Sequence, residues 1–128
     1  MKKVKVIMNE QHKLMEEQIK ILNERFGESW EIYPVPEKGW SLEEMKRVYE
    51  ELKSGYVIVF ASPIPYLIMK LAHDEGYYIA ASENPLYGAT YTSSTVLIFH
   101  NDKREKKELP NGRIVHVVAQ TGWQLVQY

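Results

Sequence analysis

The stretch Tyr56-Val57-Ile58-Val59-Phe60-Ala61 has no charged side chain and is rich in β-branched and aromatic residues. A continuous apolar run of this length is typical of a central parallel strand that is covered on both faces. The residues that follow it, Ser62-Pro63-Ile64-Pro65, turn the chain into a helix that we expect to end before Gly76. This helix has so little polar face that we expect it to be largely buried.

Two similar units precede this stretch. Val4 to Met8 is a short β-branched run that predicts a first strand. A helical pattern follows and stops at Gly27, with one apolar face formed by Leu14, Met15, Ile19, Leu22 and Phe26. Trp30 to Val35 then alternates as a second strand does, and the prolines at its end place it at a sheet edge.

The start of the second helix is the clearest local signal. Ser41 is a good N-cap and Glu44 completes a capping box, which together satisfy two backbone amides that lack helical partners. Trp40 and Met45 occupy the two hydrophobic-staple positions on either side of this cap. Ser54-Gly55 ends the helix.

After the third helix the alternation of strand and helix stops. Tyr77 to Ala81 predicts a fourth strand, and Thr92 to Phe99 and Arg113 to Ala119 predict two more. Residues 101–112 hold mixed charges and end in Pro-Asn-Gly, which predicts a charged hairpin. Trp123 to Val126 is a candidate last strand.

This order predicts an α/β fold with a single Rossmann-like domain spanning residues 1–128. We expect a β/α core at 1–84 with a mostly parallel sheet of order 2-1-3-4, because parallel strands joined by helices need right-handed crossovers. We expect residues 85–128 to form an antiparallel β-rich C-terminal tail beside the fourth strand.

Composition excludes several classes of protein. With 16 basic and 17 acidic side chains the chain has no overall basic field, so we expect no DNA partner. The absence of cysteine excludes a disulfide scaffold, a zinc ribbon, an iron–sulfur site and a thiol nucleophile. We find no signal-peptide pattern and no apolar window near the roughly 18–20 residues of a membrane span, and therefore expect a cytoplasmic protein without a membrane partner.

Polar residues follow three of the predicted parallel strands, where open α/β sheets bind their ligands. The amino end of the third helix also points its free amides at this edge. Because three separate loops contribute uncharged donors, the group is a stronger candidate than any of its members. The candidate ligand-binding residues are Asn9, Gln11 and His12 after the first strand, Ser62 and Ile64 after the third, and Ser82, Glu83, Asn84, Tyr87 and Thr90 after the fourth.

Several of these residues also have a purely structural interpretation. Ser62 before Pro63 has the pattern of a helix N-cap followed by a proline at the first helical position. Asn9 is a candidate cap for the first helix, and His12 falls on its first turn as a solvated surface residue would. Tyr87 is equally a candidate for loop packing.

Signatures of cofactor sites are absent from the sequence. There is no G-x-G-x-x-G after the first strand and no G-x-x-x-x-G-K-[ST], so we expect neither a dinucleotide cofactor nor a P-loop. No two histidines have the spacing of metal ligands, so we expect no metal site.

The stretch from Gly55 to Thr90 resembles the small CRISPR-associated ring nucleases, single-domain relatives of the CRISPR-associated Rossmann fold. The resemblance rests on an apolar strand, a Ser-x-Pro turn at Ser62, a buried helix closing at Gly76, a second apolar strand and a polar loop ending in Gly88. It covers a little over a quarter of the chain, and the hairpin and the β-rich tail depart from it.

The resemblance implies a homodimer that binds a cyclic oligoadenylate, with the tetra-adenylate favoured, across its two-fold axis in type III CRISPR antiviral signalling. By analogy the contacts are Asn9, Gln11, His12, Ser62, Ser82, Asn84 and Tyr87. It further implies metal-independent cleavage, in which a ribose 2′-hydroxyl attacks the adjacent phosphate and leaves a 2′,3′-cyclic phosphate. His12 is then the general acid or base, and Ser62 with the helix amides holds the phosphate. Glu83 is an alternative base, although its charge would repel a polyanion.

Other functions compete with this one. A non-catalytic sponge or sensor would bind the same ligand and leave it intact. A protein-interaction domain would use the charged hairpin and bind no nucleotide. An enzyme acting on another small nucleotide or anion would use the same edge of the sheet.

Overall fold

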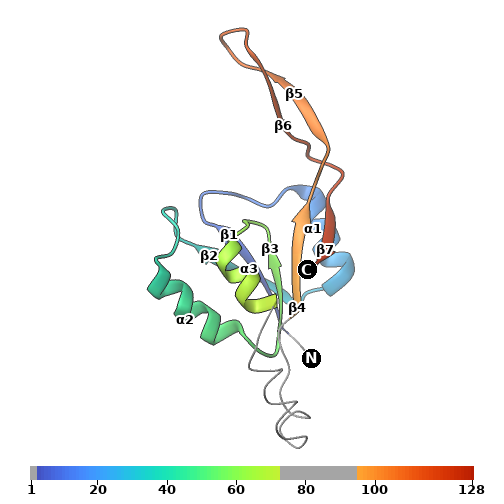
Figure 1. Cartoon of the computed structure of the whole chain (residues 1–128). Coiled ribbons are helices and arrows are strands. Elements are labelled where there is room, and N and C mark those ends of the chain that lie inside the picture. Colours follow the sequence, from blue (N-terminus) through green and yellow to red (C-terminus); the bar gives the residue numbers. More distant parts are fainter. Residues whose placement is uncertain (1–2, 73–94) are drawn as a thin grey trace, which may run out of the picture.

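The structure is a computed structural model that describes residues 3–72 and 95–128 (Figure 1). Its elements follow one another in the order β1 (Lys3–Asn9), α1 (Glu16–Phe26), β2 (Trp30–Val35), α2 (Leu42–Leu52), β3 (Tyr56–Phe60), α3 (Pro65–Ala72), β4 (Thr95–His100), β5 (Arg104–Glu108), β6 (Ile114–Val118) and β7 (Gln124–Gln127). Five strands form one sheet in the order β2-β1-β3-β4-β7, and β5 and β6 form a separate hairpin. None of the described helices is long and apolar enough to cross a membrane.

The central sheet is mostly parallel, which confirms the predicted α/β class. β1 lies between β2 and β3 and pairs with both in parallel, and β4 pairs in parallel with the other edge of β3. β7 is antiparallel to β4. β2 is an edge strand, as its prolines predicted, because a proline lacks the N–H that a second neighbour would need.

The prediction for the strand next to β3 was wrong. We expected Tyr77–Ala81 at that position and Thr92–Phe99 in the antiparallel tail. Instead, Thr95–His100 pairs in parallel with β3, with Val57 opposite Thr95 and Phe60 opposite Ile98. Both stretches are apolar runs, and sequence pattern alone does not decide which of two such runs occupies a sheet position. Tyr77–Ala81 lies outside the described residues.

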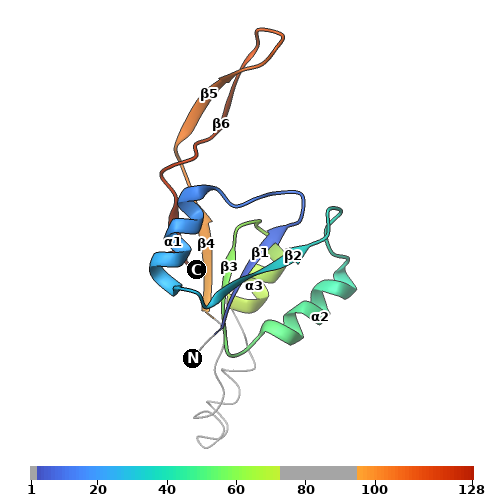
Figure 2. The same ribbon diagram turned by 180° about the vertical axis from the view of Figure 1, so that it is seen from behind.

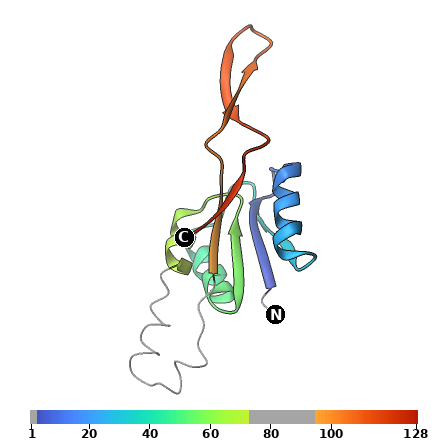
Figure 3. The ribbon, with the colours of Figure 1, turned by 90° about the vertical axis from the view of Figure 1, so that its right-hand side faces the viewer.

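Helices cover both faces of the sheet, with α1 on one face and α2 and α3 on the other (Figures 2 and 3). β3 contributes to both layers of the core. Ile58 and Phe60 pack with α2 and α3, whereas Val59 packs on the α1 side, and all three are fully buried. This burial on two faces is the physical reason why β3 is apolar at every position.

The second helix begins as predicted. The Glu44 amide donates to Ser41 Oγ, at 3.2 Å, and the Ser41 amide donates to Glu44 Oε1, at 3.3 Å, so both halves of the capping box are formed. α3 is less buried than expected: Leu67, Ile68 and Leu71 face the core, but Met69 is 58 % exposed. A helix that packs on one sheet face leaves its outer side in water whatever its composition.

The edge strand β2 is tied to α2 through Tyr33. Its hydroxyl donates to Glu51 Oε2 at 2.9 Å, and its ring packs edge-to-face against Trp40 with 5.9 Å between centroids. Burial of the phenol, reinforced by the hydrogen bond to the Glu51 carboxylate and its charge, raises the pKa of Tyr33 from 10.0 to about 12.

The charged hairpin exists, but its boundaries differ from the predicted 101–112. Its strands are Arg104–Glu108 and Ile114–Val118, so the second strand lies beyond the predicted range. The Pro-Asn-Gly turn is confirmed: Gly112 has a φ of +83° and donates its amide to Leu109 O. The hairpin extends away from the sheet beyond the carboxyl end of β4 (Figure 1).

A buried asparagine holds the neck of the hairpin, defined as residues 101–103 and 119–123. Asn101 is 7 % exposed, and its Nδ2 donates to Ala119 O and to Thr121 O, each at 3.0 Å. Its Oδ1 accepts the Lys103 amide at 2.9 Å. The neck is joined to α1 by Glu17 Oε1, which accepts the amides of the last two neck residues, Gly122 and Trp123. The base of the hairpin is therefore fixed although its strands are exposed.

We predict that Asn101→Ala lowers the free energy of unfolding by about 1–3 kcal/mol, because it leaves buried backbone groups without partners. Denaturant unfolding monitored by circular dichroism measures this change. The matched control is Asn111→Ala in the exposed turn, where Oδ1 accepts only the Arg113 amide and water can replace it. Equal effects of the two substitutions would contradict the assigned role of the neck.

The raised pKa of Tyr33 gives a pH dependence with a definite sign. The folded state favours the neutral phenol, so this contribution to stability is complete below pH 10.0 and is lost as the pH rises toward about 12. We expect Tyr33→Phe to remove a phenol that titrates near pH 12 from an ultraviolet titration, and to reduce the loss of stability between pH 10.0 and about 12. If the titration curves of the wild type and of Tyr33→Phe differed only near pH 10, where exposed tyrosines ionise, the assigned pKa of Tyr33 would be wrong.

Candidate functional site

The carboxyl ends of β1 and β3 are joined by three hydrogen bonds. The amides of Ala61 and Ser62 both donate to Ile7 O, at 2.9 and 3.0 Å. In return, the Asn9 amide donates to Ser62 Oγ at 2.9 Å. The loop after β3 is therefore attached to the end of β1, and the predicted proximity of Asn9 and Ser62 is confirmed.

The Asn9 side chain extends this connection to β2. Its Nδ2 faces Pro36 O and Glu37 O at 3.2 and 3.3 Å, and its Oδ1 accepts the Gln11 amide at 3.0 Å. The sequence suggested Asn9 as a cap for α1, and this was wrong. That helix begins later, with Met15 at the N-cap position, so six residues of connection separate it from β1.

Ser62 is not the N-cap of α3. The helix starts at Pro65, and its first helical hydrogen bond runs from the Ile68 amide to Ile64 O. The sequence Ser-Pro-Ile-Pro offers a proline at two possible first positions, and the second is used. This leaves the Ser62 hydroxyl facing β1 rather than the helix.

A cleft of about 270 Å³ opens beside this junction, on the sheet face covered by α2 and α3. The amides of Tyr66 and Leu67, in the first turn of α3, have no partner within the helix and lie next to the residues that line it. No lining residue carries an ionisable side chain. The lining residues are Asn9, Val35, Gly39, Trp40, Met45, Ser62, Pro63, Ile64 and Pro65.

A second, larger cleft of about 460 Å³ lies on the α1 side of β1 and β2. Its walls are mainly apolar, and Ile32 among them is 43 % exposed. His12 and Lys13 line it, and Asn9 lines both clefts. Its remaining lining residues are Met8, Glu10, Leu14, Ile19, Trp30 and Ile32.

His12 was predicted on the first turn of the first helix, but it lies in the connection before α1. Its amide donates to Asn9 O at 2.9 Å. It lines the apolar cleft, whereas Ser62 lines the other. The two predicted catalytic residues are therefore not brought into one cleft. Gln11 is exposed and lines neither.

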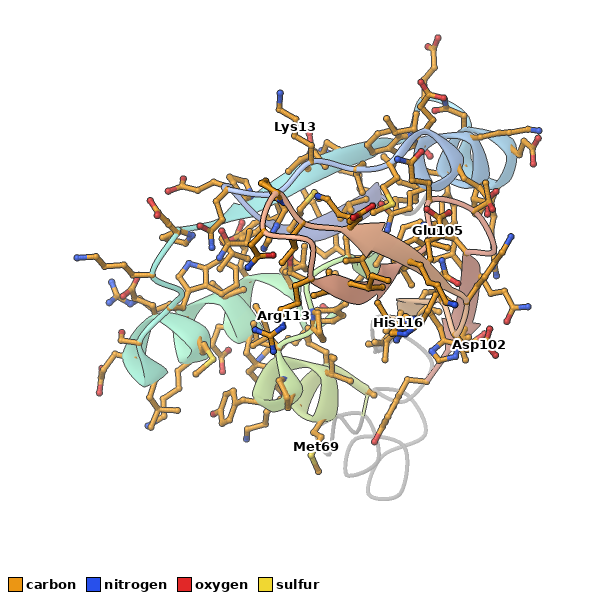
Figure 4. The ribbon with its side chains drawn as sticks, turned by 90° about the horizontal axis from the view of Figure 1, so that it is seen from above. Lys13, Met69, Asp102, Glu105, Arg113 and His116 are labelled. Carbon is orange, nitrogen blue, oxygen red and sulfur yellow. The ribbon has the colours of Figure 1, made fainter. Side chains whose placement is uncertain are left out.

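The charge at this edge is mixed. Glu10 Oε1 accepts the Glu37 amide at 3.0 Å, which fixes one carboxylate near the end of β1. Lys13 is the cation nearest in sequence, and Figure 4 shows its side chain pointing away from the molecule. Among the described residues no group of three histidine, aspartate or glutamate side chains is placed to hold a metal ion.

Sequence reasoning missed some of the residues that build the clefts. Trp40 and Met45 were assigned to the helix staple, and Trp30 to the start of the second strand, yet all three line a cleft. Their positions in the second strand and second helix gave no signal of this. The candidates after the predicted fourth strand, Ser82, Glu83, Asn84, Tyr87 and Thr90, lie outside the described residues.

We compared the chain with models of protein families, with curated proteins and with solved structures, and none of the three comparisons gives a match. The site is therefore defined by its own geometry: two loops joined through Asn9 and Ser62, with one cleft beside Ser62 and a second, larger cleft on the α1 side of β1 and β2.

Proposed function

We propose that the carboxyl edge of the sheet binds a nucleotide, and that the ligand is a cyclic oligoadenylate, with the tetra-adenylate favoured. The observation that carries this proposal is the junction of Asn9 with Ser62 beside the first turn of α3. A phosphate placed there meets neutral N–H and O–H donors and the positive end of the helix dipole.

The two clefts suit the two chemical parts of a nucleotide. Beside the Ser62 cleft, the amides of Tyr66 and Leu67 have no partner within α3 and are available to a phosphate. The cleft beside Trp30 and Ile32 offers apolar walls for an adenine ring. Asn9 lines both, so a nucleotide that lies across the end of β1 reaches the two clefts together.

The resemblance to the ring nucleases adds the finer parts of the proposal. These are a Rossmann-like domain, a homodimer, and a ligand with two-fold symmetry that spans both copies. A symmetric dimer duplicates every loop, so few neutral donors per chain become a ring of contacts. Such a ligand links the protein to CRISPR-associated antiviral signalling.

Cleavage of the bound ring requires in-line attack of a 2′-hydroxyl on its neighbouring phosphate, with departure of the 5′-oxygen. Ser62 and the α3 amides would stabilise the extra negative charge on the phosphate. His12 would act as the general base that takes the proton of the 2′-hydroxyl or as the general acid that protonates the departing 5′-oxygen. Against cleavage stands one observation: no ionisable side chain lines the cleft that holds Ser62. Binding without cleavage, as in a sponge or sensor, is therefore the second candidate function.

The test is a native-gel shift with cyclic tri-, tetra- and hexa-adenylate, followed by chromatography of the recovered ligand. We expect a shift with the tetra-adenylate, and about tenfold weaker binding for Ser62→Ala, because one hydrogen bond of about 1 kcal/mol or slightly more is lost. Ser29→Ala is the matched control, since Ser29 precedes β2 at the opposite end of the strands.

The state of the recovered ligand separates the candidates. Cleaved ligand, with cleavage slowed at least about a hundredfold by His12→Ala, supports the ring nuclease. Intact ligand supports the sponge or sensor. No shift with any of the three rings would refute the proposed ligand. The hairpin-mediated protein interaction and an enzyme acting on another small nucleotide or anion would then be the remaining candidates.

A further inference from the structure

The β5–β6 hairpin leaves an apolar strand edge in solvent. β6 reads Ile-Val-His-Val-Val, and Ile114 is 61 % exposed, with Val117 and Val118 each 37 % exposed. Within residues 3–72 and 95–128, β6 pairs with β5 alone. An isolated two-stranded hairpin is marginally stable in water and gains stability from further strands. The arrangement therefore favours a third strand along β6.

The hydrogen bonds at the two ends of the hairpin show which backbone groups are available. The Leu109 amide donates to Arg113 O, and the Ala119 amide donates to Lys103 O. Because bonded and non-bonded pairs alternate along an antiparallel ladder, Val115 and Val117 direct their backbone groups toward β5. The N–H and C=O groups of Ile114, His116 and Val118 then face outward.

We propose that two copies of this chain pair along β6, antiparallel, with His116 opposite its own counterpart on the two-fold axis. The strand reads the same in both directions in chemical type, with two apolar residues on each side of the histidine. Self-pairing therefore places Ile114 opposite Val118 of the other copy and Val115 opposite its Val117. The three outward residues are in the hydrogen-bonded positions of the new ladder.

The charges of β5 oppose pairing at the alternative edge. Every residue of β5 is charged, and charged edge strands resist pairing. In the resulting four-stranded sheet, the two β5 strands are the outer strands, three strand spacings of about 4.8 Å apart, so their charges neither favour nor oppose the contact along β6.

The size of the contact sets the expected strength. A five-residue strand edge is much smaller than the roughly 1,200–2,000 Å² of a standard stable interface. We therefore expect a weak dimer that dissociates on dilution. The hairpin stands clear of the sheet, so its outer edge is accessible (Figures 1 and 3). This inference does not depend on the proposed ligand, because it concerns a contact formed without nucleotide.

Disulfide trapping tests the register directly. The chain contains no cysteine, so His116→Cys introduces a single thiol. Cα atoms of a hydrogen-bonded antiparallel pair lie about 5.5 Å apart, which is within disulfide range. We expect mild oxidation to convert most of this variant to a covalent dimer. Lys106→Cys is the matched control, because Lys106 is the cross-strand partner of His116 on the other edge, and it should stay largely monomeric.

Proline substitution at the same two positions is the second measurement, made by sedimentation velocity over a range of protein concentrations without nucleotide. Both amides face away from the hairpin ladder, so proline at either position leaves that ladder intact. His116→Pro should abolish dimer formation and Lys106→Pro should not. A wild-type chain that is monomeric at every concentration, or trapping that is equal at both positions, would overturn the proposal.

Discussion

The parallel pairing of β1 with β3, buried between two helical layers, is the constraint on which the rest of the structure depends. Val6, Ile7, Val59 and Phe60 are fully buried in this pair, so neither strand can slip by one residue without moving its apolar side chains to the wrong face. The same register brings the end of β1 beside the first residues after β3. The Asn9–Ser62 hydrogen bond, and both clefts beside it, follow from that alignment.

Sequence patterns predicted the parts of the fold whose cause is local or periodic. The capping box at Ser41, the edge position of β2 and the two-sided burial of β3 each follow from a few neighbouring residues. The strand that pairs with β3 on the side opposite β1 could not be predicted in this way. Thr95–His100 and Tyr77–Ala81 have the same apolar character, and the choice between them depends on tertiary packing rather than on pattern.

The candidate site was predictable to a similar degree. Asn9 and Ser62 were correctly expected at one edge, because parallel strands end together. Their alternative interpretation as helix caps was wrong, because both helices begin several residues later. His12 was expected near Ser62 but lines the opposite cleft, because a six-residue connection, and not a helix, follows β1. Loop paths of this kind have no periodic signature in sequence.

The central claim is that a nucleotide lies across the end of β1, where it contacts the loop after β3. The most direct measurement is an amide NMR titration of the wild-type protein with cyclic tetra-adenylate. The account predicts saturable shifts for the amides of Asn9, Ser62 and Tyr66, and none for Ser29 at the opposite end of the strands. Unchanged Asn9 and Ser62 signals at saturating ligand, or shifts confined to the hairpin, would contradict it.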